Sequence, residues 1–230
     1  WFDYLNLRLN GAAVHKAFLA GEIPFTDPHI RLAFELWASL VEKGYFLQTS
    51  ATQGIDDALA MVAPAVGGVS PQAAMVLSGP AFLGLLTPQQ RDALDFFPFP
   101  VLDFAQPPAE VVMAIGYMIP AQAPNREAAL TFAGLLASEE GRNLLAADIA
   151  ASGLYAPLTA RFDDPSLPAG VRQGVALVSK AEAITAPTYM SVSPALWPAF
   201  MNMQRKLLTE PGSGKAFDLE GLLATLEAAR

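Results

Sequence analysis

The stretch DPHIRLAFELWASLVEKG, from Asp27 to Gly44, predicts the best-defined helix of this chain. Asp27 can cap the helix with its side chain, and Pro28 is well tolerated at the first helical position. Apolar residues then recur at spacings of three and four from Ile30 to Val41, so one face is suited to burial. Gly44 favours the end of the helix at this point.

Further helices are predicted on both sides of this stretch. They are expected at residues 2–9, ending at Asn10-Gly11, at 57–62, after the caps Asn125 and Ser138, at 170–180, after Ser193-Pro194, and after the cap Asp218. Four of their aromatic residues are expected in the core: Phe34, Trp37, Phe132 and Phe200.

Three apolar stretches predict strands. Residues 73–77 and 111–119 are expected to be buried strands, because short apolar runs bounded by proline and glycine are typical of a covered sheet. Residues 94–99 contain Pro98 and are at best an edge strand. Strands separated by helices indicate an α/β fold.

The composition limits the class of protein. The 230 residues are 53% hydrophobic and 16% charged, with a mean hydropathy of +0.33, which excludes a disordered chain. A net charge of −8 without a basic run argues against a nucleic-acid partner. The absence of cysteine excludes disulfides and Cys-ligated metals. The uncharged stretch between Asp57 and Arg91 is interrupted by prolines and glycines, so we expect buried strand and loop rather than a membrane span.

Sequence signatures of catalysis are scarce. The chain has no G-x-S-x-G, H-E-x-x-H, P-loop or dinucleotide-binding motif. His15 and His29 have no second ligand at metal spacing, so both are expected at the surface or at helix ends. Neither a metal nor a cofactor is expected. Two carboxylates brought together by folding could still act as in a glycosidase, so a carbohydrate-active enzyme remains the alternative, with a protein-interaction scaffold third.

Aromatic residues stand in loops or at the ends of elements. They are Trp1, Tyr4, Phe82, Tyr117, Tyr155, Tyr189 and Trp197. Aromatic faces bind the apolar faces of sugar rings, while polar neighbours bond to the hydroxyls. The distribution is compatible with carbohydrate binding, although core packing also explains such residues.

A series of short motifs runs through the chain in a specific order. They are WFDYLNLRLNG at 1–11, PFTDP at 24–28, AAM and SGP at 73–80, FPFP at 97–100, GYMIP at 116–120 and LASEEG at 136–141. In order and spacing they resemble the family 1 extracellular solute-binding proteins, the sugar-binding subunits of ABC importers. The resemblance covers nearly the whole chain.

The resemblance implies a two-lobed, periplasmic-binding-protein-like α/β fold of type II. This chain would hold mainly the C-terminal lobe and part of the N-terminal lobe, most of which would be missing. Residues 1–112 would form the C-terminal lobe, 113–160 the hinge crossing and helices of the N-terminal lobe, and 161–230 the return to the C-terminal lobe. The helices from Asn125 to Ala147 would then expose an apolar face that includes Phe132, Leu136 and Leu144.

The resemblance also implies a function. A full-length protein of this kind, expected as a monomer, would capture a sugar or oligosaccharide by hinge closure and deliver it to the permease subunits of an ABC transporter. It would act in the periplasm or outside the cell, where a lipid anchor at the missing N-terminus is an option. No catalysis would be involved.

Seven residues are the expected ligand-binding set. They are Trp1, Gly79, Phe82, Gly116, Tyr117, Tyr155 and Trp197. The chain departs from the family pattern at two places. Ala81 stands where some relatives carry a stacking tryptophan, so Phe82 is the expected substitute. Ala114 and Ile115 stand where many relatives carry an acidic residue before the hinge Gly-Tyr pair, which removes an expected hydrogen bond to a sugar hydroxyl.

Overall fold

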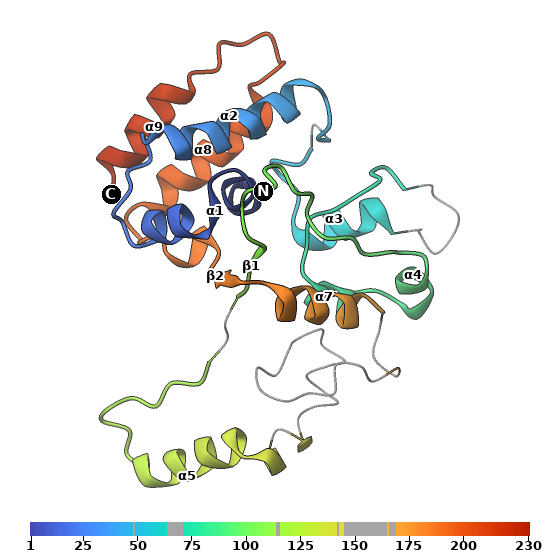
Figure 1. The fold of residues 1–230 in the computed structure, drawn as a ribbon, viewed down its shortest axis with the longest axis vertical. Helices are drawn as coiled ribbons and strands as arrows, with labels where there is room; N and C mark the ends of the chain where they lie inside the picture. The colour runs from blue at the N-terminus through green and yellow to red at the C-terminus, as the bar shows by residue number, and fades with distance from the viewer. Residues whose placement is uncertain (48, 64–70, 114–115, 142, 145–164, 166–168) are drawn as a thin grey trace. The chain divides into compact units, whose positions relative to one another are not determined.

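The computed structural model divides the chain into two compact units (Figure 1). It describes residues 1–47, 49–63, 71–113, 116–141, 143–144, 165 and 169–230. Unit 1 comprises Trp1–Leu77, Phe97–Met113 and Lys180–Arg230, and unit 2 comprises Ser78–Phe96 and Ala114–Ser179. The chain therefore passes from one unit to the other four times.

Unit 1 is built mainly from helices. Its elements are α1 (Phe2–Leu19), α2 (Pro28–Glu42), α3 (Ile55–Val62), β1 (Ala109–Val111), β2 (Ala183–Thr185), the 3-10 helix η2 (Thr188–Met190), α8 (Trp197–Thr209) and α9 (Leu219–Ala228). Helices α1, α2, α8 and α9 enclose one hydrophobic core, and their grouping is visible in Figure 1. Phe34, Trp37 and Phe200 lie in this core, as their helical spacing predicted.

Helix α2 follows its sequence signals closely. The Asp27 side chain accepts a hydrogen bond from the backbone N–H of His29, at 2.8 Å, and Pro28 occupies the first turn. Ile30 and Phe34 are fully buried on the core face. Gly44 takes a φ of 77°, a conformation that favours glycine and ends the helix.

Helix α1 is longer than predicted. The expected end at Asn10-Gly11 is a break, because Gly11 has a φ of 78° inside the helix. The chain resumes its helical course and continues to Leu19. The end of the Gln106 side chain lies against Gly11 and could move aside for a Cβ, so the positive φ is the reason that favours glycine here.

The described sheet has two strands. β1 and β2 pair in parallel, with Ala109 opposite Ala183 and Val111 opposite Thr185. The prediction of a strand over 111–119 was wrong for the described residues after Val111, which are 112–113 and 116–119, and Met118 is 93% exposed. A strand persists only where a partner runs beside it, and β1 has its partner over three residues.

The other two predicted strands, 73–77 and 94–99, were also wrong. Both stretches lie outside regular strands in the described structure. The backbone N–H groups of Gln72 and Ala73 donate to the carbonyl of Met61 near the end of α3, so this segment bonds to a helix end. Met75 is 67% exposed. An apolar run indicates burial but does not supply a neighbouring strand.

Unit 2 contains fewer described elements than unit 1. They are η1 (Pro80–Leu85), α4 (Pro88–Asp92), α5 (Arg126–Ala137) and α7 (Ala169–Lys180), whose last residue already belongs to unit 1. Ser138 accepts a hydrogen bond from the N–H of Gly141 through its Oγ, as expected of a cap. The prediction that Phe132 is a core residue was wrong, because 58% of it is exposed and α5 has no buried residue among those described. The exposed apolar face expected on these helices is present at Phe132 and Leu144.

The last two helices begin close to their predicted starts. The Oγ of Ser193 accepts a hydrogen bond from the N–H of Leu196, in a turn that precedes α8. The side chain of Asp218 accepts from the N–H of Gly221 and caps α9, as predicted. In the described part of the chain, none of the helices has the length and apolar character needed to cross a membrane.

A buried ion pair joins α1 to β1. Arg8 and Glu110 lie 2.7 Å apart, and their side chains are 9% and 3% exposed. The guanidinium of Arg8 also donates to the carbonyls of Phe99 and Ala109, while Tyr4 donates to the second carboxylate oxygen of Glu110, at 2.9 Å. Both charged groups are therefore bonded on several sides, which offsets the cost of removing them from water.

Replacing Glu110 with alanine is expected to lower the free energy of unfolding of unit 1 by about 3–5 kcal/mol, because the Arg8 charge would remain buried without its partner. Urea unfolding followed by tryptophan fluorescence measures this change. All three tryptophans of the chain, Trp1, Trp37 and Trp197, belong to unit 1, so the signal reports on that unit.

The matched control is Glu220→Ala, which breaks the exposed 2.7 Å ion pair with Arg31. The side chains of that pair are 35% and 62% exposed, and the expected loss is about 0–1 kcal/mol. A double replacement, Arg8→Met with Glu110→Leu, is expected to cost less than Glu110→Ala alone, because no charge stays buried. Equal losses in Glu110→Ala and Glu220→Ala would contradict the role of the buried pair.

Candidate ligand-binding site

The first turn of α1 lies beside the carboxyl ends of β1 and β2. Tyr4 and, one turn later, Arg8 both bond to the carboxylate of Glu110 in the middle of β1, so one face of α1 lies against this strand. Asp3 bonds to Thr188, three residues beyond the end of β2. Ligands of α/β proteins commonly bind at the carboxyl ends of parallel strands. This edge of unit 1 is therefore the candidate site.

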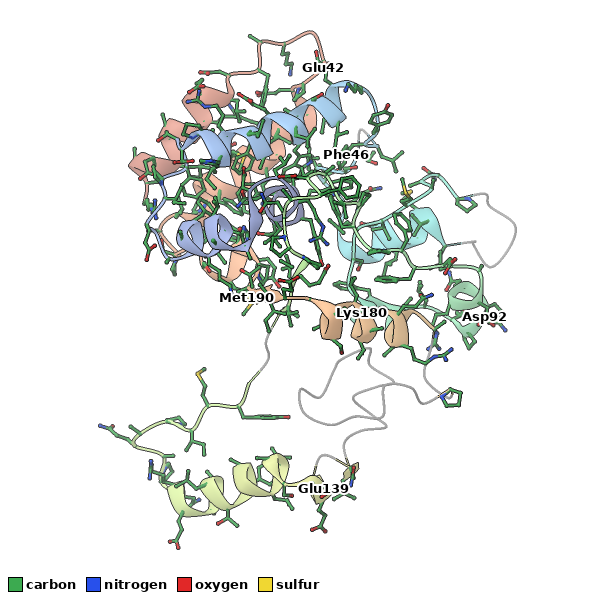
Figure 2. All side chains as sticks on the ribbon, in the orientation of Figure 1. Glu42, Phe46, Asp92, Glu139, Lys180 and Met190 are labelled. Carbon is green, nitrogen blue, oxygen red and sulfur yellow. The ribbon has the colours of Figure 1, made fainter. Side chains whose placement is uncertain are left out.

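Four aromatic residues pack together around the start of α1, and we call them the aromatic group: Trp1, Tyr4, Phe46 and Phe99. Trp1 makes edge contacts with Phe46 and Phe99, with centroid distances of 4.9 and 5.6 Å. Tyr4 stacks on Phe99 at 5.1 Å, with an angle of 14° between the rings. Phe46 comes from the segment that follows α2, where it is labelled in Figure 2. The group thus joins three separate parts of unit 1.

Trp1 combines fixed position with exposure. Its two edge contacts restrict the ring, yet 40% of the residue remains exposed. A rigid aromatic side chain with free surface can stack on the apolar face of a sugar at little entropic cost. The predicted ligand-binding role of Trp1 has suitable geometry.

Tyr4 supports Trp1 from within the protein. Burial, followed by the charge of Glu110, raises the pKa of the Tyr4 phenol well above its ordinary value. The hydroxyl therefore stays protonated and continues to donate to Glu110. Its ring also lies under the guanidinium of Arg8, 5.3 Å from the centroid, so Tyr4 connects the ion pair to the aromatic group.

Asp3 ties the start of α1 to the segment after β2. Its Oδ1 accepts hydrogen bonds from the backbone N–H of Thr188, at 2.9 Å, and from the Thr188 hydroxyl. These two bonds hold the residues next to Trp1 against the residues that follow β2. The relative placement of the two segments is fixed by side-chain chemistry as well as by apolar packing.

The expectation that His15 lies at the surface or at a helix end was wrong, because its side chain is fully buried. Asn10 donates to Oδ1 of Asn6, so the amide nitrogen of Asn6 faces Nδ1 of His15, at 2.9 Å. Nδ1 must accept this bond, and the ring proton is placed on Nε2. Nε2 lies 3.6 Å from the Asp3 carboxylate. His29, in contrast, is exposed in the first turn of α2, as predicted.

Burial lowers the pKa of His15, and the opposing effects of the Asp3 carboxylate and the Ala186 backbone do not cancel it. A second proton on the ring would also place two donors, Nδ1–H and the Asn6 amide, against each other. His15 is therefore neutral in the folded protein at neutral pH.

Trp197 belongs to unit 1 but has different neighbours from Trp1. It is the first residue of α8, is 41% exposed, and lies 6.3 Å from the ring of Phe200. Its exposure permits a ligand contact, and its contact with Phe200 connects it to the helical core. The structure gives no ring contact that joins it to the aromatic group.

The remaining members of the expected ligand-binding set fall in unit 2. Gly79 is exposed and precedes η1, and Phe82 is half-buried within η1. Gly116 is exposed, and Tyr117 is 82% exposed. Tyr155, Ala114 and Ile115 lie outside the described residues.

Several residues of this edge were missed in the sequence. Asp3 and Glu110 are carboxylates, and the sequence around them does not distinguish them from exposed carboxylates. Phe46 and Phe99 stood near or within motifs of the family resemblance, but the sequence does not show that they meet beside Trp1. Their proximity depends on contacts between segments that are distant in the chain.

A comparison with family profiles decides the family. The profile described as bacterial extracellular solute-binding protein matches residues 9–143, which is more than half of the chain. The chain belongs to this family.

The fold of this solute-binding protein also matches a solved structure. It is similar to the crystal structure of the bacterial solute receptor AcbH, with a TM-score of 0.70 and 20% sequence identity. The match covers 99% of this chain and 54% of the receptor, so this chain spans about half the receptor's length. AcbH is described as having an exclusive substrate preference for β-D-galactopyranose. The comparison with curated proteins gave no match.

These comparisons confirm the predicted family and the periplasmic-binding-protein-like fold of type II. The solute-binding protein has the mixed α/β character expected of this class, with helices predominating in the described residues. The division into lobes at residues 112 and 160 stays a prediction, as does the expected ligand-binding set.

The free energy of unfolding of unit 1 is expected to fall as the pH is lowered from 8 to 5. The unfolded chain binds a proton at His15 near pH 6.5, whereas the folded chain, with its lowered pKa, does not. The free energy of unfolding therefore falls as the pH drops below the pKa of His15 in the unfolded chain. It stops falling once the pH is below the pKa of His15 in the folded chain. Urea unfolding at a series of pH values, followed by tryptophan fluorescence, measures it.

The control variants use the two histidines of the chain. His15→Gln removes the titrating group and is expected to flatten the dependence of the free energy of unfolding on pH in this range. His29→Gln is expected to leave that dependence unchanged. A profile that is unchanged by His15→Gln would show that other groups cause the pH dependence.

Proposed function

We propose that this solute-binding protein captures a neutral sugar or oligosaccharide and delivers it to the permease of an ABC transporter, in the periplasm or outside the cell. The observation that carries the proposal is the half-exposed Trp1, which is held by two aromatic edges and stands two residues before Asp3, the residue bonded to the segment after β2. The sugar preference described for AcbH supports the ligand class. Trp197 and, in unit 2, Phe82, Tyr117 and the neighbouring glycines would supply further contacts.

Binding by hinge closure is part of the proposal. The chain leaves unit 1 directly after β1, at Met113, and re-enters it at Lys180, shortly before β2. Segments that link two compact units are suited to act as hinges, and a ligand that contacts both units stabilises the closed state. The predicted lobes, residues 1–112 with 161–230 and residues 113–160, differ from the two units at 78–96 and 161–179, which belong to unit 2.

Binding without catalysis is favoured by the carboxylates at the site. Asp3 accepts two hydrogen bonds from Thr188, and Glu110 is bonded to Arg8 and Tyr4. Both groups are thus engaged in holding the structure. A carbohydrate-active enzyme would need a carboxylic acid and a carboxylate directed at the ligand.

Trp1→Ala is expected to weaken sugar binding about fivefold, since a lost aromatic stack costs about 1 kcal/mol. Trp197→Ala is expected to act in the same direction. Calorimetric titration with D-galactose, followed by a panel of other neutral sugars, measures the affinity. The titrated solution is then analysed for cleaved or modified sugar, which the binding hypothesis excludes.

The matched control is Phe104→Ala, because Phe104 is an aromatic residue of unit 1 that is 93% exposed. This variant is expected to bind as the unaltered chain does. An affinity for sugar that is unchanged in Trp1→Ala and Trp197→Ala, together with a sharp fall in melting temperature, would show that both residues are structural. Turnover of the sugar would favour the enzyme.

A further inference from the structure

A tyrosine and a methionine meet at the carboxyl ends of the two strands. Tyr189 lies in η2, which follows β2, and Met113 stands two residues after the end of β1. The hydroxyl of Tyr189 donates to the sulfur of Met113 at 2.9 Å. The two residues are 47% and 49% exposed. Figure 2 labels the adjacent Met190 in the segment that follows β2.

The hydrogen bond between Tyr189 and Met113 is weak for a phenol donor. A thioether sulfur is a weak acceptor, whereas the hydroxyl oxygen of a sugar is a strong one. Because both side chains are half-exposed, a ligand can reach the phenol without opening the core. When a sugar hydroxyl replaces the sulfur as acceptor, the Tyr189 hydroxyl therefore makes a stronger hydrogen bond. The Met113 thioether loses only a weak hydrogen bond.

The neighbouring contacts hold Tyr189 in place. Thr188, the preceding residue, is tied by its N–H and hydroxyl to Asp3 of α1. Asp3 is separated from Trp1 by a single residue. The segment that carries the phenol is thus bound to the segment that carries the half-exposed indole, and both belong to unit 1. An aromatic face and a hydroxyl donor on linked segments suit a ligand that has apolar ring faces and polar edges.

We propose that Tyr189 is a ligand-contacting residue. Its hydroxyl gives up the hydrogen bond to the sulfur of Met113 and donates instead to a hydroxyl group of the bound sugar. This rests on the proposed function and adds a polar contact to the aromatic ones. Met113 is the group that holds the phenol while the site is empty.

Two variants separate this role from a structural one. Tyr189→Phe keeps the ring and removes the donor, so the affinity for D-galactose is expected to fall about five- to tenfold. Met113→Leu keeps the volume and removes the acceptor, so the affinity is expected to rise, because the phenol no longer gives up a bond on binding the sugar. Calorimetric titration of both variants and the unaltered chain measures the three affinities. Equal losses in the two variants, or no loss in Tyr189→Phe, would overturn the proposal.

A second measurement detects binding of the sugar that is too weak for calorimetry. With methyl-labelled methionine, a titration with D-galactose followed by NMR is expected to shift the Met113 signal. The signal of Met203, which is 1% exposed in the core, is the internal reference. A shift at the indole of Trp1 without a shift at Met113 would overturn the role of Tyr189 and leave the proposed function standing. The absence of any sugar-dependent shift, at Trp1 or at Met113, would overturn both.

Discussion

The ion pair between Arg8 and Glu110 is the constraint on which the site of this protein depends. The pair is almost completely buried and joins the middle of a helix to the middle of a strand. Buried charges are tolerated only when they are well bonded, so the positions of α1 and β1 are closely linked. This linkage holds the first turn of α1 beside β1, and Trp1 and the aromatic group lie at this start of the helix.

A second set of polar bonds completes the arrangement. Asp3 binds the segment after β2, and the neutral His15 lies behind it with Asn6 as its hydrogen-bond partner. The edge of unit 1 is thus supported by two polar networks, while the four helices of the core supply most of the apolar burial. Asp3, Arg8 and Glu110 are bonded within the protein, whereas Trp1 and Tyr189 are half-exposed. The proposal of a neutral sugar ligand rests on these exposed rings.

The helices could be predicted from the sequence because their signals are local. Asp27, Pro28 and the apolar spacing of α2 act within a few residues of one another, and the same holds for Asp218 and α9. The strands could not, because a strand depends on a partner that is distant in the chain. Of the predicted strand at 111–119, only the first residue lies in β1, where β2 is adjacent.

The site could be predicted only in part for the same reason. The ligand-binding role of Trp1 was predicted from the family resemblance and stays a prediction, and its exposure is compatible with that role. The buried position of His15 was missed, because it follows from the contacts of Asn6 and Asp3 rather than from its neighbours in sequence. The contact between Tyr189 and Met113 joins residues that are 76 positions apart, which no local pattern reveals.

The most direct test is an NMR titration of the three tryptophan indoles with D-galactose. Trp37 is 5% exposed in the core and serves as an internal reference, while Trp1 is 40% exposed at the proposed site. We expect the Trp1 indole signal to shift with saturating dependence on sugar concentration while the Trp37 signal stays in place. A Trp1 signal that is unchanged at saturating sugar, or equal shifts of Trp1 and Trp37, would contradict a sugar site at this edge.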